Sequence, residues 1–340
     1  MRTTLSVPAS RRAELARSPS SNTALTDRTV VVSGGSRGIG LAIALGAARR
    51  GANVVLLAKT AEPHPKLPGT VHTAVAEVDA AGGKGVAVVG DVRNEDDVVR
   101  AVDTAIERFG GIDIVVNNAS AIATEPTETL PTKKFDLMMD INVRGTFLLT
   151  KAALPHLRKS ALRTQGANEA LRTQGAKEAL RTQGAKEALR TQGANQTLRT
   201  QGVNELSAHV MTLSPPLNMN PHWLGAHPSY TLSKYGMTLL SLGWAAEYRD
   251  AGIAFSCLWP QTYIATSAVS NLAAGDDLVK ASRHPDIMAD AAVEIFDKPA
   301  AEANGQCYID ADVLTAAGMT DLSRYGGGED PMGDIFVDKS

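Results

Sequence analysis

The sequence predicts an α/β fold in which helices cover both faces of a parallel β-sheet. From Thr29 onward, short apolar runs rich in β-branched residues alternate with longer segments of helical periodicity. The first runs are continuously apolar, which is typical of strands buried on both faces. A length of 340 residues with 44% apolar side chains is enough to build a sizeable core.

Seven apolar runs are predicted to be strands, and the segments between them return the chain in a parallel direction. The expected strands are Thr29–Val32, Asn53–Leu57, Gly85–Val89, Ile112–Val116, His209–Leu213, Ile253–Leu258 and Gln306–Ile309. Helical periodicity is expected over Gly38–Arg50, Asn94–Phe109, Ile141–Lys159 and Ser229–Asp250. We therefore predict a doubly wound, seven-stranded parallel sheet in a single domain that spans residues 28–340.

The first 27 residues differ in composition from the rest of the chain. They contain four arginines and several serines but few acidic residues. This composition has some likeness to an organelle transit peptide, although a flexible extension is the preferred interpretation. We accordingly expect a cytoplasmic protein, with organelle targeting by the extension as the alternative. The last residues form no peroxisomal or retention signal.

Residues 162–206 contain a nine-residue unit repeated five times, with a leucine at the same position in each unit: Leu162, Leu171, Leu180, Leu189 and Leu198. At about 100° per residue, leucines at this spacing would emerge on opposite sides of an α-helix, so no apolar stripe can form. Each unit also contains a glycine, which costs about 1 kcal/mol relative to alanine inside a helix. We predict an exposed, low-complexity insertion, either a neutral expansion or an interaction module.

Composition excludes several classes of function. The net charge of -2 gives no basic footprint for nucleic acid. Cys257 and Cys307 are 50 positions apart and lie in no Cys/His cluster, which argues against a disulfide framework and against a metal site. No apolar run approaches the roughly 20 residues that a membrane span needs.

A glycine-rich turn follows the first strand. Ser33-Gly34-Gly35-Ser36-Arg37-Gly38-Ile39-Gly40 runs directly into the helix that ends at Arg50. Glycines at this point allow a tight turn and a close approach of the backbone to a pyrophosphate, while the helix N-terminus offers free N–H groups. A strand, turn, helix and strand in this order predict a dinucleotide-binding fold of the Rossmann type; the alternative is a simple left-handed turn.

The glycine spacing, G-x-x-x-G-x-G at Gly34, Gly38 and Gly40, resembles that of the short-chain dehydrogenase/reductase family. Further elements of that family follow in order over residues 29–310, apart from the insertion: Asp91-Val92, Asn117-Asn118-Ala119-Ser120, Asn142 and Tyr230-Thr231-Leu232-Ser233-Lys234. The runs A-K-T-A-E-P-H-P-K-L-P-G-T and L-S-P-P-L-N-M-N-P resemble the hydroxysteroid dehydrogenase-like protein 2 subgroup of that family. Lipid carriage and peroxisomal residence, which eukaryotic members of that subgroup have, are not carried over.

The resemblance implies a catalytic set of Tyr230, Lys234, Ser214 and Asn142. Tyr230 and Lys234 are four positions apart on one helix face, and a nearby ammonium is expected to lower the pKa of the phenol for proton exchange. Ser214 would hydrogen-bond the substrate carbonyl, although it lies 16 positions before Tyr230, a longer step than most family members have. A structural turn serine and a core amide are the alternatives for Ser214 and Asn142.

The resemblance also implies a coenzyme site. Its expected residues are Ser33, Gly34, Ser36, Arg37, Gly38, Ile39, Gly40, Lys59, Asp91, Val92, Asn118, Ala119, Tyr230, Lys234, Pro260 and Thr262. Enzymes that prefer NAD place a carboxylate at the end of the second strand, where this chain has Lys59. Lys59 and Arg37 could hold a 2′-phosphate, which favours NADP(H) over NAD(H); the alternative is that both are ordinary surface cations.

We therefore expect an NADP(H)-dependent oxidoreductase that interconverts a carbonyl and a secondary alcohol. Its expected partner is a small-molecule substrate, with neither nucleic acid nor a membrane span, and by likeness to the family it would form a homo-oligomer. The segment around Thr262–His284 would determine substrate specificity. The alternative is a catalytically weak dinucleotide-binding sensor or scaffold that uses the repeat as its interaction surface.

Overall fold

A computed structural model of the chain describes residues 25–64, 69–164, 207–270 and 275–338. Leu25, which the sequence places in the N-terminal extension, is fully buried in the core, so the described body begins there. The rest of the predicted extension and residues 165–206 of the predicted repeat insertion lie outside the described residues.

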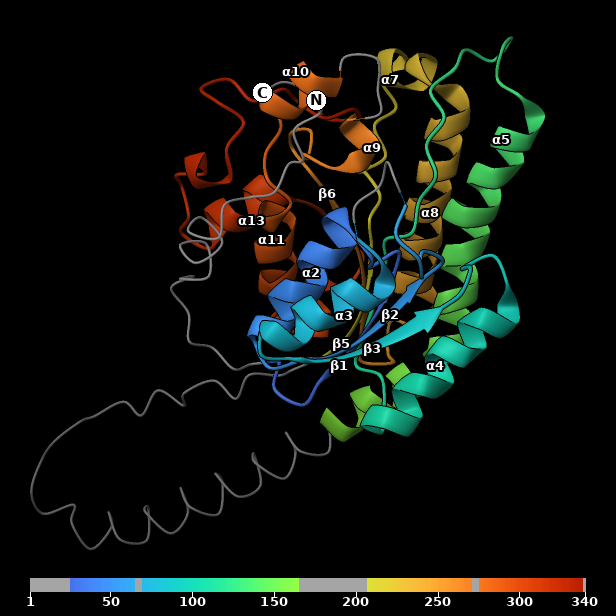
Figure 1. Ribbon diagram of the computed structural model, residues 1–340, viewed down its shortest axis with the longest axis vertical. Coiled ribbons are helices and arrows are strands. Elements are labelled where there is room, and N and C mark those ends of the chain that lie inside the picture. The colour runs from blue at the N-terminus through green and yellow to red at the C-terminus, as the bar shows by residue number, and fades with distance from the viewer. Residues whose placement is uncertain (1–24, 65–68, 165–206, 271–274, 339–340) are drawn as a thin grey trace, which may run out of the picture.

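The described residues form one seven-stranded parallel sheet in the order β3-β2-β1-β4-β5-β6-β7 (Figure 1). All seven predicted strands are confirmed, with bounds displaced by at most two residues. The order reverses between β1 and β4, which creates the crevice where sheets of this kind bind ligands. The strands are β1 Thr29–Ser33, β2 Asn53–Ala58, β3 Lys84–Val89, β4 Ile114–Asn117, β5 Ala208–Thr212, β6 Ile253–Trp259 and β7 Cys307–Ile309.

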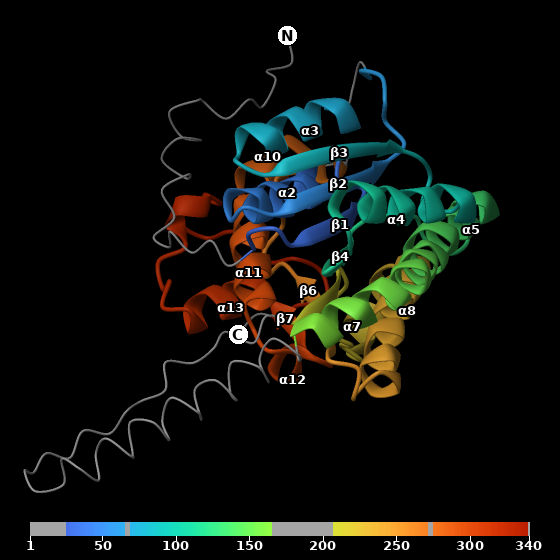
Figure 2. The same ribbon diagram turned by 90° about the horizontal axis from the view of Figure 1, so that it is seen from below.

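Helices cover both faces of the sheet (Figure 2). Val30 and Val32 of β1 point into one core, while Val31 between them points into the other, as the alternation along a strand requires. The first core contains α2 Gly38–Arg49, α3 Val71–Ala80, α11 Asp286–Phe296 and α13 Asp310–Ala316. The second contains α4 Glu95–Phe109, the helix 145–164 and α8 Pro228–Glu247.

The predicted helix Ile141–Lys159 begins earlier and ends later than the sequence indicated. It opens as α5 Thr132–Met138, widens into the π-helix η1 Met139–Arg144 and continues as the helix 145–164. The first turns are mostly exposed, so they lack the apolar stripe on which the prediction depended. Leu162, the first leucine of the predicted insertion, therefore still belongs to this helix.

The described chain stops at residue 164 and resumes at 207 beside the amino-terminal edge of the sheet. Ser160 and Arg163 near the helix end both contact Asp113, which directly precedes β4. Ser207 accepts a hydrogen bond through its carbonyl from Arg28, which directly precedes β1. The described ends of the repeat-bearing segment therefore lie at the sheet edge opposite the crevice.

Short helices complete the described chain: α7 Pro221–Ala226, α9 Ser267–Ser270, α10 Gly275–Lys280, α12 Ala300–Ala303 and the 3₁₀ turn η2 Ser323–Tyr325. Among the helices of the described residues, none combines the length and the apolar character needed to cross a membrane.

Candidate active site

The glycine-rich turn connects β1 to α2 at the carboxyl edge of the sheet. Gly34 and Gly38 have positive φ angles of 69° and 58°, which favour glycine over any residue with a Cβ. At Gly40 a Cβ would lie 2.4 Å from the Asn118 amide nitrogen and 2.8 Å from the Gly34 carbonyl oxygen. No side chain caps the N-terminus of α2, so its first N–H groups stay available to an anion.

Ser33 and Asn118 lock this turn to the chain that follows β4. The buried Ser33 hydroxyl accepts hydrogen bonds from the backbone N–H groups of Asn118 and Ala119, both at 3.1 Å. In return, the Asn118 side-chain amide donates to the carbonyls of Ser33 (3.0 Å) and Gly34 (3.1 Å). The two sides of the crevice are thereby held in one geometry, and the residues predicted for the pyrophosphate and the ribose are brought together.

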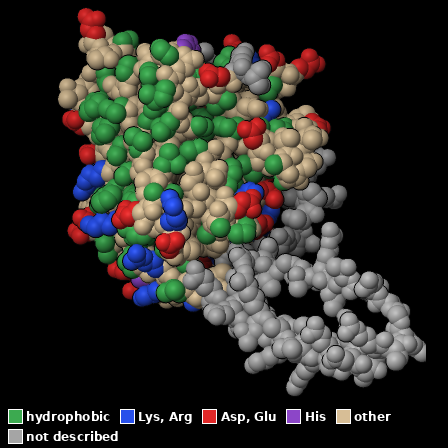
Figure 3. Space-filling view, turned by 180° about the vertical axis from the view of Figure 1, so that it is seen from behind, with side chains coloured by type: hydrophobic (Ala, Val, Ile, Leu, Met, Phe, Trp, Pro, Cys, Tyr) green, Lys and Arg blue, Asp and Glu red, His purple; other side chains and the backbone are tan. Residues whose placement is uncertain are grey.

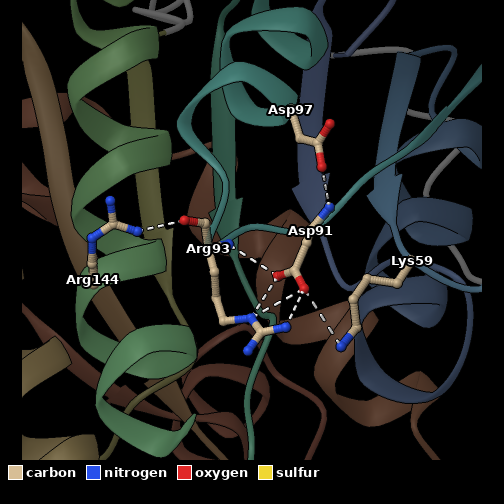
Figure 4. A network of polar contacts seen from close by, with 5 residues as sticks. All are labelled: Lys59, Asp91, Arg93, Asp97 and Arg144. Carbon is tan, nitrogen blue, oxygen red and sulfur yellow. Dashed lines mark hydrogen bonds and ion pairs between the residues drawn. The ribbon is translucent and has the colours of Figure 1, made fainter. Parts of the chain in front are cut away.

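A charged cluster lies beside this turn, at the ends of β2 and β3 (Figure 4). The Asp91 carboxylate accepts hydrogen bonds from the Arg93 guanidinium, the shortest at 2.6 Å, and forms an ion pair with Lys59 at 3.7 Å. The hydrogen bond from Arg93 is the main reason that the pKa of Asp91 is lowered. Lys59 remains more than half exposed, and Val92 is buried against Gly145. The structure therefore gives Asp91, predicted for the coenzyme site, a partner in Arg93 that the sequence pattern did not indicate.

Arg37 belongs to the glycine turn itself, and Thr262 follows β6. The Arg37 guanidinium donates to the Gly69 carbonyl at 3.2 Å, which ties it to the chain just before α3. Thr262 is 4% exposed, and its hydroxyl makes no hydrogen bond within the described residues. Pro260 before it is buried, and Thr266 packs 3.3 Å from where a Gly38 Cβ would be. An unsatisfied buried hydroxyl next to a glycine cradle fits a dinucleotide whose nicotinamide end reaches Thr262.

Tyr230 and Lys234 lie on the first turns of α8, as predicted. They are 5% and 2% exposed. The Lys234 ammonium donates to the Leu213 carbonyl at the end of β5, at 2.7 Å, and lies 5.1 Å from the centre of the Trp259 ring. These contacts fix the lysine against the carboxyl ends of β5 and β6.

The proton affinities of this pair differ from the sequence-based expectation. The pKa of Tyr230 is raised above its ordinary range, chiefly by burial and then by the charge of Asp334. Burial also lowers the pKa of Lys234 to about 7. The expectation that the lysine lowers the pKa of the phenol is therefore wrong for this structure, because desolvation opposes charge on both side chains. At neutral pH the phenol stays protonated.

Asn142 connects the π-helix η1, the loop after β4 and helix α8. It lies fully buried in η1, where the wider helix turn marks a break in the regular hydrogen-bond ladder. Its amide accepts from Ala121 N–H at 2.7 Å and donates to the Ala121 carbonyl at 3.0 Å and to the Ser233 hydroxyl at 2.9 Å. Ser233 in turn donates to the Tyr230 carbonyl at 2.8 Å. Asn142 thus ties the loop after β4 to the helix that carries Tyr230.

Ser214 lies just after β5. It is fully buried, and its hydroxyl makes no hydrogen bond with a nitrogen or oxygen atom of the described residues. It lies beside the thiol of Cys257 on β6, whose pKa it helps to lower. The hydroxyl of Ser120, an exposed residue of the loop after β4, acts against burial and lowers the pKa of the Tyr230 phenol.

The C-terminal segment 332–338 covers Tyr230, and nothing in the sequence pattern predicted this. Backbone hydrogen bonds attach it to the chain after β6, from Tyr263 N–H to the Met332 carbonyl (3.0 Å) and from Asp334 N–H to the Gln261 carbonyl (2.9 Å). Trp259 adds a hydrogen bond from its indole nitrogen to the Ile335 carbonyl at 3.0 Å. The segment thus forms a wall of the site beside Tyr230.

Phe336 is the centre of that wall. Its ring stacks on Tyr230 with a centroid distance of 6.3 Å and an interplanar angle of 27°, and it also contacts Tyr235 and Trp259. Its φ angle of 71° is a strained conformation for a bulky residue, which such surrounding contacts must hold in place. Asp334 is 8% exposed, and burial raises its pKa to about 8.

Comparison with known proteins shows which family this chain resembles. Residues 28–166 match the family model of the short chain dehydrogenases. The chain is 44% identical to hydroxysteroid dehydrogenase-like protein 2 of Xenopus tropicalis over 314 residues, which are 92% of this chain but only 64% of that relative. The chain therefore spans less than two thirds of the length of the curated relatives that it matches.

Solved structures extend the likeness to nearly the whole chain. A putative dehydrogenase from Xanthomonas campestris is 44% identical with a TM-score of 0.76, and the match covers 93% of this chain and 99% of that one. A short chain dehydrogenase from Mycobacterium thermoresistibile is 43% identical with a TM-score of 0.74, over 92% and 96% of the two chains.

Two more distant structures share the fold at TM-scores of 0.58 and 0.57. Their identities are 23% and 22%, and each match covers 84% of this chain and 96% of the other. One is an NADH-dependent reductase complexed with NAD, and the other is a metagenomic short-chain oxidoreductase in complex with NADP. With the glycine cradle, the Tyr230–Lys234 pair and these similarities in agreement, the chain belongs to the short-chain dehydrogenase/reductase family.

Proposed function

We propose that this protein is an NADP(H)-dependent oxidoreductase that interconverts a carbonyl and a secondary alcohol. The observation that carries the proposal is the placement of Tyr230 and Lys234 together at the carboxyl edge of the sheet, on the same side as the glycine cradle. A proton donor and a dinucleotide cradle at one sheet edge are the two parts that hydride transfer to a carbonyl requires.

When bound, the coenzyme supplies the hydride for reduction or accepts it in oxidation. Tyr230 then handles the proton. Because burial raises the pKa of the phenol, the group is protonated at neutral pH and can donate to the carbonyl oxygen. Such proton transfer typically contributes about 10²–10⁴-fold to a rate.

Lys234 lies one helical turn beyond Tyr230, where it can supply a proton after the phenol has given up its own. Its pKa of about 7 lets the amine gain or lose a proton at neutral pH, so it can return one to the phenolate. The Leu213 carbonyl, 2.7 Å from the ammonium, holds the side chain in position during this exchange.

The preference for NADP(H) is supported by charge at the end of β2. Lys59 occupies the position where enzymes that prefer NAD have a carboxylate, and its ammonium is more than half exposed. Arg37 projects from the glycine turn and reaches the chain just before α3. Both cations lie where they could approach a ribose 2′-phosphate. Lys59 also forms an ion pair with Asp91.

An apolar surface supports the proposed homo-oligomer. Figure 3 shows hydrophobic side chains gathered on the side of the molecule that carries α8. Leu232 and Leu239 of α8 and Phe147 of the helix 145–164 are 52%, 58% and 42% exposed. Apolar side chains on neighbouring helices are a common basis for self-association.

A second candidate function is a dinucleotide-binding sensor or scaffold. The burial of Tyr230 beneath Phe336 favours it, because a substrate needs access to the phenol. The sensor would bind the coenzyme as the enzyme does but would need no proton transfer.

A screen of NADPH and NADH consumption against a panel of aldehydes and ketones tests the proposal. The absorbance of the reduced nicotinamide should fall with at least one carbonyl, faster with NADPH than with NADH. Tight NADPH binding without turnover across the panel, or in reverse across the corresponding alcohols with NADP⁺, would favour the sensor.

A further inference from the structure

A carboxylate stands beside the lysine that would hold the coenzyme 2′-phosphate. Asp91 Oδ2 lies 3.7 Å from the Lys59 ammonium, and the Asp91 side chain is only 21% exposed. Hydrogen bonds from Arg93 lower the pKa of this carboxyl group, so it is ionised at neutral pH. An ionised carboxylate at this distance would repel a phosphate and offset the charge of Lys59. The proposed preference for NADP(H) therefore requires a second partner for Asp91.

The Arg93 guanidinium is the main partner of Asp91. Its Nε donates to both carboxylate oxygens at 3.1 Å, its Nη2 donates to Oδ2 at 2.6 Å, and the Arg93 backbone N–H donates to Oδ1 at 3.0 Å. Lys59 is the weaker partner, because its 3.7 Å separation is beyond the range of a hydrogen bond. Figure 4 shows the two cations reaching the carboxylate from different sides. Lys59, which is more than half exposed, therefore remains available to a ligand.

Neighbouring contacts hold this pair in place. The Arg144 guanidinium donates to the Arg93 carbonyl, and the Asp91 N–H donates to Asp97 Oδ2 at 2.8 Å. Asp97 in turn forms an ion pair with Arg100 at 2.7 Å. Arg93 and Arg100 thus each pair with a different carboxylate of the cluster. The Asp91 carboxylate and the Arg93 guanidinium are therefore fixed relative to each other by the chain on both sides.

We propose that Arg93 determines the coenzyme preference by taking up the charge of Asp91, so that Lys59 can bind the ribose 2′-phosphate of NADP(H). This inference rests on the proposed function. Arg93 is a positioning residue, since it acts on the phosphate through Asp91 and Lys59. Without Arg93, the Asp91 carboxylate and the Lys59 ammonium would pair with each other, and the attraction for the 2′-phosphate would be largely cancelled.

The test measures the dissociation constants of NADPH and NADH by their fluorescence on the full chain. Both coenzymes carry the same adenine and nicotinamide, so the ratio of the two constants isolates the 2′-phosphate. Arg93→Leu should weaken NADPH binding by about 5–20-fold, part of what a lost charge-assisted contact costs, and change NADH binding by less than about threefold. Arg93→Lys keeps a cation beside Asp91 and should keep most of the preference. Arg100→Leu, the matched control, removes an arginine that pairs with Asp97 and should change the ratio by less than about threefold.

A double variant separates this role from direct binding of the phosphate by Arg93. Asp91→Asn added to Arg93→Leu removes the competing carboxylate, so the ratio should return to within about threefold of the unmodified protein. A double variant as weak for NADPH as Arg93→Leu, an unchanged ratio in Arg93→Leu, or an equal loss of both coenzymes would overturn the inference and leave the proposed function intact. An unmodified protein that binds NADH as tightly as NADPH would overturn the proposed preference for NADP(H) and the inference with it.

Discussion

Gly40→Ala is the substitution for which the structure predicts the largest local conflict in the coenzyme cradle. The added Cβ would lie 2.4 Å from the Asn118 amide nitrogen and 2.9 Å from its side-chain carbon, far inside normal contact distance. Gly40 is the third residue of α2, and Asn118 is the residue that ties this turn to the loop after β4. The substitution therefore forces Asn118 out of its position.

The magnitude follows from the hydrogen bonds that a displaced Asn118 can no longer make. Its bonds to the Ser33 and Gly34 carbonyls are each worth about 0.5–1.5 kcal/mol. Overpacking a rigid site costs about 1–3 kcal/mol more, and alanine returns up to about 1 kcal/mol in helix propensity. We expect the free energy of unfolding to fall by about 1–5 kcal/mol and NADPH binding to weaken roughly tenfold or more.

Urea denaturation followed by circular dichroism, together with NADPH fluorescence titration, measures both effects. Gly243→Ala is the matched control: Gly243 is exposed in α8 with no atom within 4 Å of the added Cβ. That variant should gain about 0.5–1 kcal/mol. If Gly40→Ala is as stable as the unmodified protein and binds NADPH equally well, then the hydrogen bonds of Asn118 to the Ser33 and Gly34 carbonyls do not hold the glycine turn in place.

Three further predictions concern charge and assembly. Lys59→Asp should lower the ratio of NADPH to NADH kcat/KM by roughly 10–100-fold, and an unchanged ratio would contradict the role given to this lysine. Burial raises the pKa of Asp334 to about 8 in the folded protein, so the folded state holds this proton more tightly than the unfolded state. The free energy of unfolding therefore falls as the pH rises toward about 8. Asp334→Asn should therefore gain stability relative to the unmodified protein between about pH 5 and 8, by at most about 1.4 kcal/mol per pH unit in urea unfolding; parallel pH curves would contradict this. Leu239→Glu should reduce the mass measured by light scattering toward that of one chain, whereas Val99→Glu on α4 should not; equal masses would exclude α8 as the interface.

The strands and the cradle could be predicted from the sequence because local pattern determines them. A run such as Thr29–Val32 is buried on both faces, so continuous β-branched residues identify it without tertiary information. Gly34, Gly38 and Gly40 are required by backbone angles and close contacts within one turn. Tyr230 and Lys234 share a helix face because of their spacing.

The surroundings of the catalytic pair could not be predicted, because distant segments create them. The segment 332–338 has no periodic pattern, yet it supplies Phe336 and Asp334 to the site from the far end of the chain. The direction of the pKa shift at Tyr230 depends on that burial, which no spacing reveals. Ser214 shows the same limit, since only the structure reveals that its hydroxyl is fully buried and that the next residue, Pro215, is held against α8.

Paired measurements on Tyr230→Phe test the central claim most directly: the NADPH dissociation constant and the steady-state rate of carbonyl reduction, both from one preparation. The substitution removes the phenol oxygen and keeps the ring that stacks on Phe336. We predict an unchanged dissociation constant with a rate at least 10²-fold lower. A variant that reduces the carbonyl as fast as the unmodified protein would show that Tyr230 is not the proton donor.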